Sequence, residues 1–186
     1  MRQLVVFNSV SVDGYFVDGT GDMSWAHTRD PEFEEFTNGN ARGGGGLLVF
    51  GRKTWEMMAS YWPTPQAIKA LPVVAKTMNG ASKLVFSRTL STADWNNTRL
   101  VRGDPVEEVR RLKKEDGPGM VVMGSGSIVA QLAQAGLVDE YQLVVIPVAL
   151  GAGRTLFDGV KKRLPLKLTG SRIFGNGNAF LTYAPA

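Results

Sequence analysis

The chain has 186 residues, of which 44% are hydrophobic and 20% are charged, proportions that are typical of a globular protein. It contains no cysteine, which excludes disulfides, thiolate metal sites and a cysteine nucleophile. The formal net charge is +4, but the basic residues are spread along the chain without interleaved aromatic residues, so we expect no nucleic acid partner.

The first expected strand begins almost at the amino terminus, over Leu4–Val10. Its apolar run is too short for a signal sequence or a membrane span. We therefore expect a cytoplasmic protein with no membrane partner. The length predicts a single domain over residues 1–186.

Short apolar runs alternate with segments of helical pattern along the rest of the chain. Strands are expected at Leu4–Val10, Leu47–Phe50, Lys83–Phe86, Met120–Met123 and Tyr141–Val148, and helices at Pro31–Phe36, Thr54–Tyr61, Val106–Lys114 and Ser127–Ala135. Nearly continuous hydrophobicity is typical of parallel strands that are covered on both faces. The pattern predicts an α/β fold with a mostly parallel central sheet and helices on both faces. Asp30 and Asp104, each before a proline, are expected to cap two helices.

Two segments depart from this alternation. The glycine-rich segment Arg42–Gly46 is expected to be a flexible loop, because the composition does not change on either side of it. Near the carboxy terminus, Asn176 and Gly177 lie between the runs Leu166–Phe174 and Ala179–Tyr183, which is a hairpin pattern. The sheet is therefore expected to end in an antiparallel hairpin.

Two glycine-containing turns each follow an expected strand and precede an expected helix. The first covers Gly51–Thr54, and the second covers Gly124–Ser127. The N-terminus of a helix offers unpaired N–H groups and a partial positive charge to a phosphate, and glycine permits close approach. Each turn alone is explained by ordinary turn chemistry. Together, the two turns could hold one pyrophosphate.

These turns carry a resemblance to a known family. Phe50–Glu56 resembles the Gly-Arg-x-Thr-Trp-Glu segment of dihydrofolate reductases, and Gly124–Ser127 resembles their second glycine-rich turn. Lys83–Arg88 is similar to the segment that meets the adenosine 2′-phosphate in that family. The resemblance is closer still to the reductase domain of riboflavin-biosynthesis deaminase/reductase proteins, the RibD C-terminal domain, through the segments Ser11–Gly14, Ala135–Tyr141, Pro147–Phe157 and Leu181–Tyr183.

The resemblance implies a dihydrofolate reductase-like three-layer fold and an NADPH-dependent oxidoreductase that works as a homodimer. It places Val10 and Trp25 at the nicotinamide, and Ser87 with Arg88 at the 2′-phosphate. At the pyrophosphate it places Gly51, Arg52, Lys53, Thr54, Gly124, Ser125, Gly126, Ser127, Ile128 and Val129.

The substrate implied by the resemblance is a small heterocycle, of the 5-amino-6-(5-phosphoribosylamino)uracil type or of the dihydrofolate type. Met123 stands where riboflavin-pathway reductases usually carry a glutamate, which indicates an altered substrate pocket. A non-catalytic nucleotide-binding module and a flavin-binding dimeric module are the alternatives. A pocket beside the nicotinamide on which Asp13, Glu32 and Tyr61 converge would favour the reductase.

Two carboxylates are the candidate catalytic residues, although hydride transfer needs few ionisable groups because the cofactor supplies the chemistry. Glu32 matches the pattern of the pterin-binding carboxylate in dihydrofolate reductases, and a buried carboxyl there would have a raised pKa. The alternative is that Glu32 only contributes to an acidic first turn. Asp13 is either a second acid facing the cleft or a turn residue before Gly14.

One aromatic residue and one histidine complete the candidates. Tyr61 is expected to wall the substrate site, with simple packing as the alternative. His27 is the only histidine, so we expect no metal site and interpret His27 as a loop residue.

Overall fold

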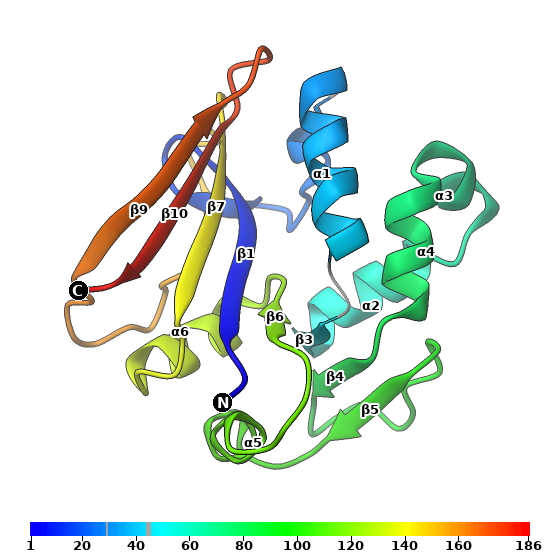
Figure 1. Cartoon of the computed structure of the whole chain (residues 1–186), viewed down its shortest axis with the longest axis vertical. Helices are drawn as coiled ribbons and strands as arrows, with labels where there is room; N and C mark the ends of the chain where they lie inside the picture. Colours follow the sequence, from blue (N-terminus) through cyan, green and yellow to red (C-terminus); the bar gives the residue numbers. More distant parts are fainter. Residues whose placement is uncertain (29, 44–45) are drawn as a thin grey trace.

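The computed structural model describes residues 1–28, 30–43 and 46–186. Its main sheet consists of β1 (Leu4–Ser11), β3 (Leu47–Gly51), β4 (Lys83–Phe86), β5 (Thr98–Val101), β6 (Met120–Val122), β7 (Glu140–Ile146), β9 (Leu166–Ile173) and β10 (Ala179–Pro185). The strand order is β5-β4-β3-β6-β1-β7-β10-β9 (Figure 1). All pairs from β5 to β7 are parallel, whereas β10 runs antiparallel to both β7 and β9. The predicted sheet with an antiparallel carboxy-terminal hairpin is confirmed.

Six α-helices and a short 3₁₀-helix are found in the described residues. They are η1 (Ser24–Ala26), α1 (Pro31–Gly43), α2 (Arg52–Tyr61), α3 (Pro65–Ala70), α4 (Pro72–Gly80), α5 (Pro105–Lys113) and α6 (Gly126–Gln134). The two short strands β2 (Tyr15–Asp18) and β8 (Gly153–Thr155) pair with each other in a separate sheet. No helix in the described part of the chain is long and apolar enough to cross a membrane.

The helices cover both faces of the sheet, as the continuous apolar strands predicted. On β3 and β4, Val49 and Leu84 belong to the core cluster that also contains residues of α5 and α6. Their neighbours Leu48, Phe50 and Val85 pack instead with residues of α2 and α4. Because side chains alternate along a strand, this division corresponds to the three layers visible in Figure 1.

Both expected helix caps are present. The Asp30 carboxylate accepts a hydrogen bond from the Phe33 N–H at 2.8 Å, and the Asp104 carboxylate accepts two from the first turn of α5. Helix α1 continues to Gly43 instead of ending at Phe36, because tertiary contacts with α4 override weak local propensity. In the glycine-rich segment expected to be a loop, Arg42 and Gly43 therefore end α1, and residues 44–45 lie outside the described residues.

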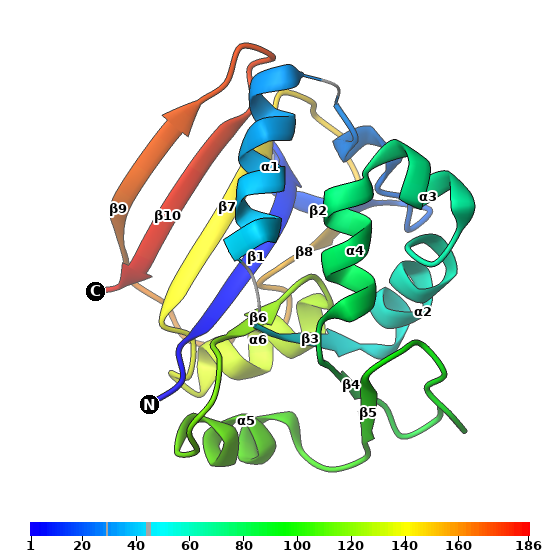
Figure 2. The same ribbon diagram turned by 45° about the vertical axis from the view of Figure 1, so that its right-hand side comes forward.

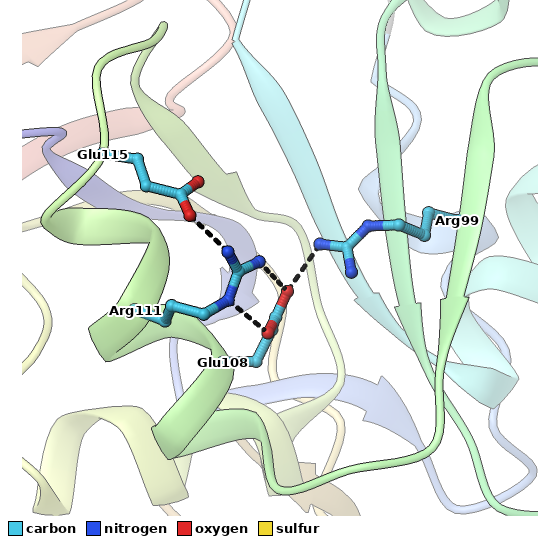
Figure 3. A network of polar contacts seen from close by, with 4 residues as sticks. All are labelled: Arg99, Glu108, Arg111 and Glu115. Atoms are coloured by element: carbon cyan, nitrogen blue, oxygen red, sulfur yellow. Dashed lines mark hydrogen bonds and ion pairs between the residues drawn. The ribbon is translucent and has the colours of Figure 1, made fainter.

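An ion-pair network connects edge strand β5 to helix α5 (Figure 3). The Glu108 carboxylate accepts hydrogen bonds from Arg99 of β5 at 2.5 Å and from Arg111 of the same helix at 2.8 Å. Arg111 also pairs with Glu115. Hydrogen bonding from Arg111 and Arg99 lowers the pKa of Glu108 to about 2.

Candidate functional site

The two glycine turns lie against each other at the carboxyl ends of strands β3 and β6. These strands are parallel neighbours, so the turns that follow them emerge at the same edge of the sheet. The Gly51 N–H donates to the Ser125 hydroxyl at 2.8 Å, and that hydroxyl donates to the Thr54 hydroxyl at 2.8 Å. The Gly124 N–H donates to the Asn8 side-chain oxygen on β1 at 3.2 Å. The two turns therefore form one hydrogen-bonded unit.

Close packing at this unit requires glycine at two positions. A Cβ atom on Gly51 would lie 2.6 Å from the Ser125 Oγ, which is closer than real Cβ atoms come to a neighbour. A Cβ atom on Gly126 would lie 2.9 Å from the Thr155 carbonyl oxygen and 3.0 Å from the Phe16 ring. Gly51 therefore allows the start of α2 to approach the start of α6, and Gly126 allows the start of α6 to approach Phe16 and Thr155.

A cavity of about 510 Å³ lies over the two turns. Neither α2 nor α6 has a side-chain N-cap among the described residues, so N–H groups at both helix starts can bind an anion. Ten of the predicted cofactor-binding residues line this cavity: Gly51, Arg52, Lys53, Thr54, Ser87, Arg88, Ser125, Gly126, Ser127 and Ile128. The structure thus brings together the two predicted pyrophosphate turns and the predicted 2′-phosphate segment.

A larger cavity, of about 1060 Å³, adjoins the first. Phe16, Lys53, Thr54 and Arg154 line both cavities, so the two form one continuous cleft. The larger cavity is lined by Tyr61 and by apolar side chains of β1, α1, α2, α4 and the positions that directly follow α2 and β6. These include Phe7, Phe33, Met57, Met58, Trp62, Val74 and Met123. One end of the cleft therefore suits phosphate groups, and the other suits flat rings.

Glu32 does not have the environment that was expected of a catalytic acid. Its side chain is 49% exposed and forms an ion pair with Arg172 of β9 at 2.8 Å. The hydrogen bond from Arg172 lowers the pKa of Glu32 instead of raising it. The guanidinium of Arg172 lies 4.7 Å from the Phe174 ring, so Glu32 points toward the hairpin. On the same helix, it is Glu34 that lines the larger cavity.

Asp13 is a structural residue of a loop, so the expectation of a second catalytic acid is wrong. Its carboxylate accepts hydrogen bonds from the Ser11 hydroxyl at 2.6 Å and from the backbone N–H groups of Leu150 and Gly151. These bonds, led by the one from Ser11, lower its pKa to about 2. A carboxyl with this pKa is ionised at neutral pH and does not serve there as an acid.

Four predicted cofactor positions differ from expectation. Val129 is fully buried in the core, one turn of helix inside the N-terminus of α6. Val10 and Trp25 are not among the residues that line either cavity, and the indole N–H of Trp25 donates to the Asp22 carbonyl at 3.2 Å. Gly124 lines the larger cavity. Of Asp13, Glu32 and Tyr61, which were expected to converge on one pocket, only Tyr61 lines it.

Several lining residues were missed in the sequence. Met57 and Met58 stand on the same helix as Tyr61 and were available from its helical spacing. Phe16 and Arg154 lie on β2 and β8, strands too short to give a hydrophobic pattern. No local signal in the sequence could have found these two.

Comparison with known proteins identifies a family and a similar bacterial protein. Residues 2–180 match the RibD C-terminal domain family. The uncharacterized protein YyaP of Bacillus subtilis is 30% identical over 184 residues, which cover 98% of this chain and 94% of YyaP.

Solved structures share the fold at lower identity. A protein from Shewanella sp. PV-4 with a proposed role in riboflavin biosynthesis is 22% identical, with a TM-score of 0.79 over 100% of this chain and 99% of its own. A diaminohydroxyphosphoribosylaminopyrimidine deaminase/5-amino-6-(5-phosphoribosylamino)uracil reductase from Thermotoga maritima is 15% identical, with a TM-score of 0.67 over 100% of this chain and 57% of its own. These likenesses confirm the expected dihydrofolate reductase-like fold.

Proposed function

The chain belongs to the RibD C-terminal domain family, and we propose on that premise that it is a reductase that binds NADPH and reduces a small heterocycle. The observation that carries this proposal is the continuous cleft, in which two glycine turns and Ser87–Arg88 meet at one end and an apolar chamber opens at the other. A dinucleotide with charged phosphates and a flat terminal ring matches both ends.

The residues of the smaller cavity fit the phosphates of NADPH. The starts of α2 and α6 supply backbone N–H groups and helix dipoles for the diphosphate, with Lys53 adding positive charge beside them. Arg88 and Ser87, which follow β4, would hold the adenosine 2′-phosphate. The close packing at Gly51 supports this assignment, because a larger residue there would push the starts of α2 and α6 apart.

The residues of the larger cavity would orient the substrate and exclude water. When bound, the dihydronicotinamide supplies a hydride. The chain mainly orients the nicotinamide and the substrate and excludes water from them. Met57 and Met58 of α2 and Trp62, which directly follows that helix, form an apolar wall in which the Trp62 indole N–H contacts the Met58 sulfur at 3.0 Å. Glu34 brings a carboxylate to the cavity from α1 and would accept hydrogen bonds from ring N–H groups of the substrate.

Substrates of the 5-amino-6-(5-phosphoribosylamino)uracil type and of the dihydrofolate type both fit this description. Met123 lines the cavity at the position where riboflavin-pathway reductases usually carry a glutamate, so recognition through that carboxylate is replaced here by an apolar contact.

The test is a fluorescence titration of the purified protein with NADPH and with NADH, repeated on Arg88→Ala. We expect micromolar binding of NADPH that weakens by about tenfold or more in Arg88→Ala, because a charge-assisted contact to the 2′-phosphate is lost. NADH binding should not change. Arg110→Ala is the matched control, since Arg110 is exposed on α5 and lines neither cavity.

Failure of the wild-type protein to bind either nucleotide would overturn the proposal. Binding of NADPH without oxidation by any heterocycle in a screen would instead identify a nucleotide-binding module. A yellow protein as purified would favour a flavin-binding module.

A further inference from the structure

Arg154 lies where the two cavities join. It is one of four residues that line both, together with Phe16, Lys53 and Thr54. Lys53 and Thr54 belong to the first glycine turn, whereas Arg154 belongs to β8. Figure 2 shows β8 beside β2, and the two strands pair antiparallel with Val17 opposite Arg154. A cation from a separate element of the fold therefore reaches the middle of the cleft.

Arg154 is an exposed residue whose guanidinium lies near the start of α6. Its guanidinium lies 5.6 Å from the centre of the Phe16 ring, a distance at which a cation is attracted to an aromatic face. The same ring packs so closely on Gly126, the first residue of α6, that a Cβ atom there would be 3.0 Å from it. The backbone of Thr155, the next residue along β8, also contacts Gly126. The guanidinium of Arg154 therefore lies near a helix N-terminus.

Arg154 takes part in none of the ion pairs found between residues 1–28, 30–43 and 46–186. Within the described residues, the ion pair at this site joins Arg52 to Glu56 at 3.1 Å and does not involve Arg154. A guanidinium beside a helix N-terminus places two sources of positive potential next to each other, and this arrangement selects an anion with several oxygens.

We infer that Arg154 binds the nicotinamide-side phosphate of the cofactor's diphosphate, an inference that rests on the function proposed above. A dinucleotide that places its 2′-phosphate at Arg88 and its nicotinamide in the larger cavity has its diphosphate at the junction between them. The glycine turns meet the adenosine-side phosphate, and Arg154 meets the other. Arg154 is therefore a positioning residue that fixes the nicotinamide half at the entrance to the substrate cavity.

Two ligands distinguish the contacts to the nicotinamide-side phosphate from the contacts to the adenosine half of the cofactor. NADPH carries both phosphates of the diphosphate, whereas adenosine 2′,5′-bisphosphate keeps the 2′-phosphate and only the adenosine-side phosphate. Binding of each ligand would be measured by isothermal titration calorimetry on the wild-type protein, Arg154→Met, Arg154→Lys and Arg88→Ala. Arg163→Met, which changes an exposed arginine that lines neither cavity, is the control.

We expect Arg154→Met to weaken NADPH binding by about tenfold or more while the affinity for adenosine 2′,5′-bisphosphate stays the same, because only NADPH has the contacted phosphate. Arg154→Lys keeps the charge but loses the planar guanidinium, so it should weaken NADPH binding less than Arg154→Met does. Arg88→Ala should weaken both ligands alike. An unchanged affinity for adenosine 2′,5′-bisphosphate also shows that the variant is folded.

Equal weakening of both ligands by Arg154→Met would overturn the inference, and so would unchanged NADPH binding. If Arg154→Met does not fold, the inference is tested on Arg154→Lys. This variant must weaken the binding of NADPH without weakening that of adenosine 2′,5′-bisphosphate. Failure of the proposed function is a different result, in which the wild-type protein binds neither ligand.

Discussion

The hydroxyl of Ser125 accepts a hydrogen bond from the backbone N–H of Gly51 at 2.8 Å, and this contact joins turns that are 74 residues apart in the chain. The backbone of Ser125 has a φ of 62° and therefore lies in the left-handed region that favours glycine. This unfavourable backbone conformation occurs at the position where the starts of α2 and α6 meet. The geometry of the smaller cavity therefore depends on the fit between Gly51 and Ser125.

Gly51→Ala should destabilise the protein and weaken NADPH binding. The new methyl group would lie 2.6 Å from the Ser125 Oγ and 2.9 Å from its Cβ, so the turns must separate. Overpacking of this kind costs about 1–3 kcal/mol of unfolding free energy. Urea denaturation and NADPH titration measure the two effects.

The double variant Gly51→Ala with Ser125→Gly provides the control. Glycine at position 125 removes the two atoms that the methyl group would meet most closely, leaving the Ile128 Cγ1 at 3.2 Å, and suits the positive φ. We expect the double variant to be more stable than additivity of the two single variants predicts. Strict additivity would show that Gly51 and Ser125 are not coupled.

Neighbouring carboxylates on α1 should differ in their effect on turnover. Glu34 lines the larger cavity, whereas Glu32 is paired with Arg172 outside it. With an acceptor found in the substrate screen, Glu34→Gln should lower kcat/KM by about tenfold, the value of a hydrogen bond to a charged group. Glu32→Gln should leave kcat/KM unchanged. The reverse order of effects in steady-state NADPH oxidation would show that Glu34 does not contact the substrate.

Lys83 is expected to be required for stability and not for binding. Its side chain is almost fully buried, and burial lowers its pKa to about 8, so at pH 7 the amine is still charged. Its Nζ donates to the carbonyl groups of Asn79, Ala81 and Asn96 at 3.2, 2.8 and 2.9 Å.

Lys83→Met leaves these three carbonyl groups without their donor, and we expect a loss of about 3 kcal/mol of unfolding free energy in urea denaturation. Lys76→Met, which changes an exposed lysine on α4, should have little effect. Equal stability of the two variants would contradict the structural role of Lys83.

The strands and the glycine turns could be predicted because their signals are local. Consecutive apolar residues identify a covered parallel strand, as at Leu47–Gly51, and a glycine between a strand and a helix identifies a turn. The sequence also shows that each turn follows a predicted strand. The parallel pairing of those strands, β3 and β6, then brings the two turns together.

The residues that could not be predicted depend on contacts far apart in the chain. Glu32 was misjudged because its partner, Arg172, is 140 residues away. Asp13 was misjudged because it binds backbone N–H groups of Leu150 and Gly151, which follow β7. Arg154 was missed because its place in the cleft follows from the pairing of two short strands. In each case the chemistry of the side chain is set by its distant partner.

The network around Glu108 should give the protein a specific dependence on acid (Figure 3). Hydrogen bonds from Arg111 and Arg99 lower the pKa of Glu108 from its ordinary value of 4.5 to about 2. Between these values the unfolded chain binds a proton that the folded chain does not, so the contribution to stability is complete above pH 4.5 and is lost as the pH falls toward 2.

At pH 7, Glu108→Gln should therefore cost about 1–2 kcal/mol of unfolding free energy, because its side chain is mostly buried and bonded to two arginines. The difference from wild type should shrink as the pH falls below 4.5 and nearly vanish at pH 2, provided that both proteins are still folded there. Urea denaturation at a series of pH values measures this difference. Glu107→Gln, an exposed change on the same turn of α5, is the control and should leave the unfolding free energy at pH 7 nearly unchanged. A constant difference between Glu108→Gln and wild type across the series would mean that Glu108 acts through packing and not through its charge.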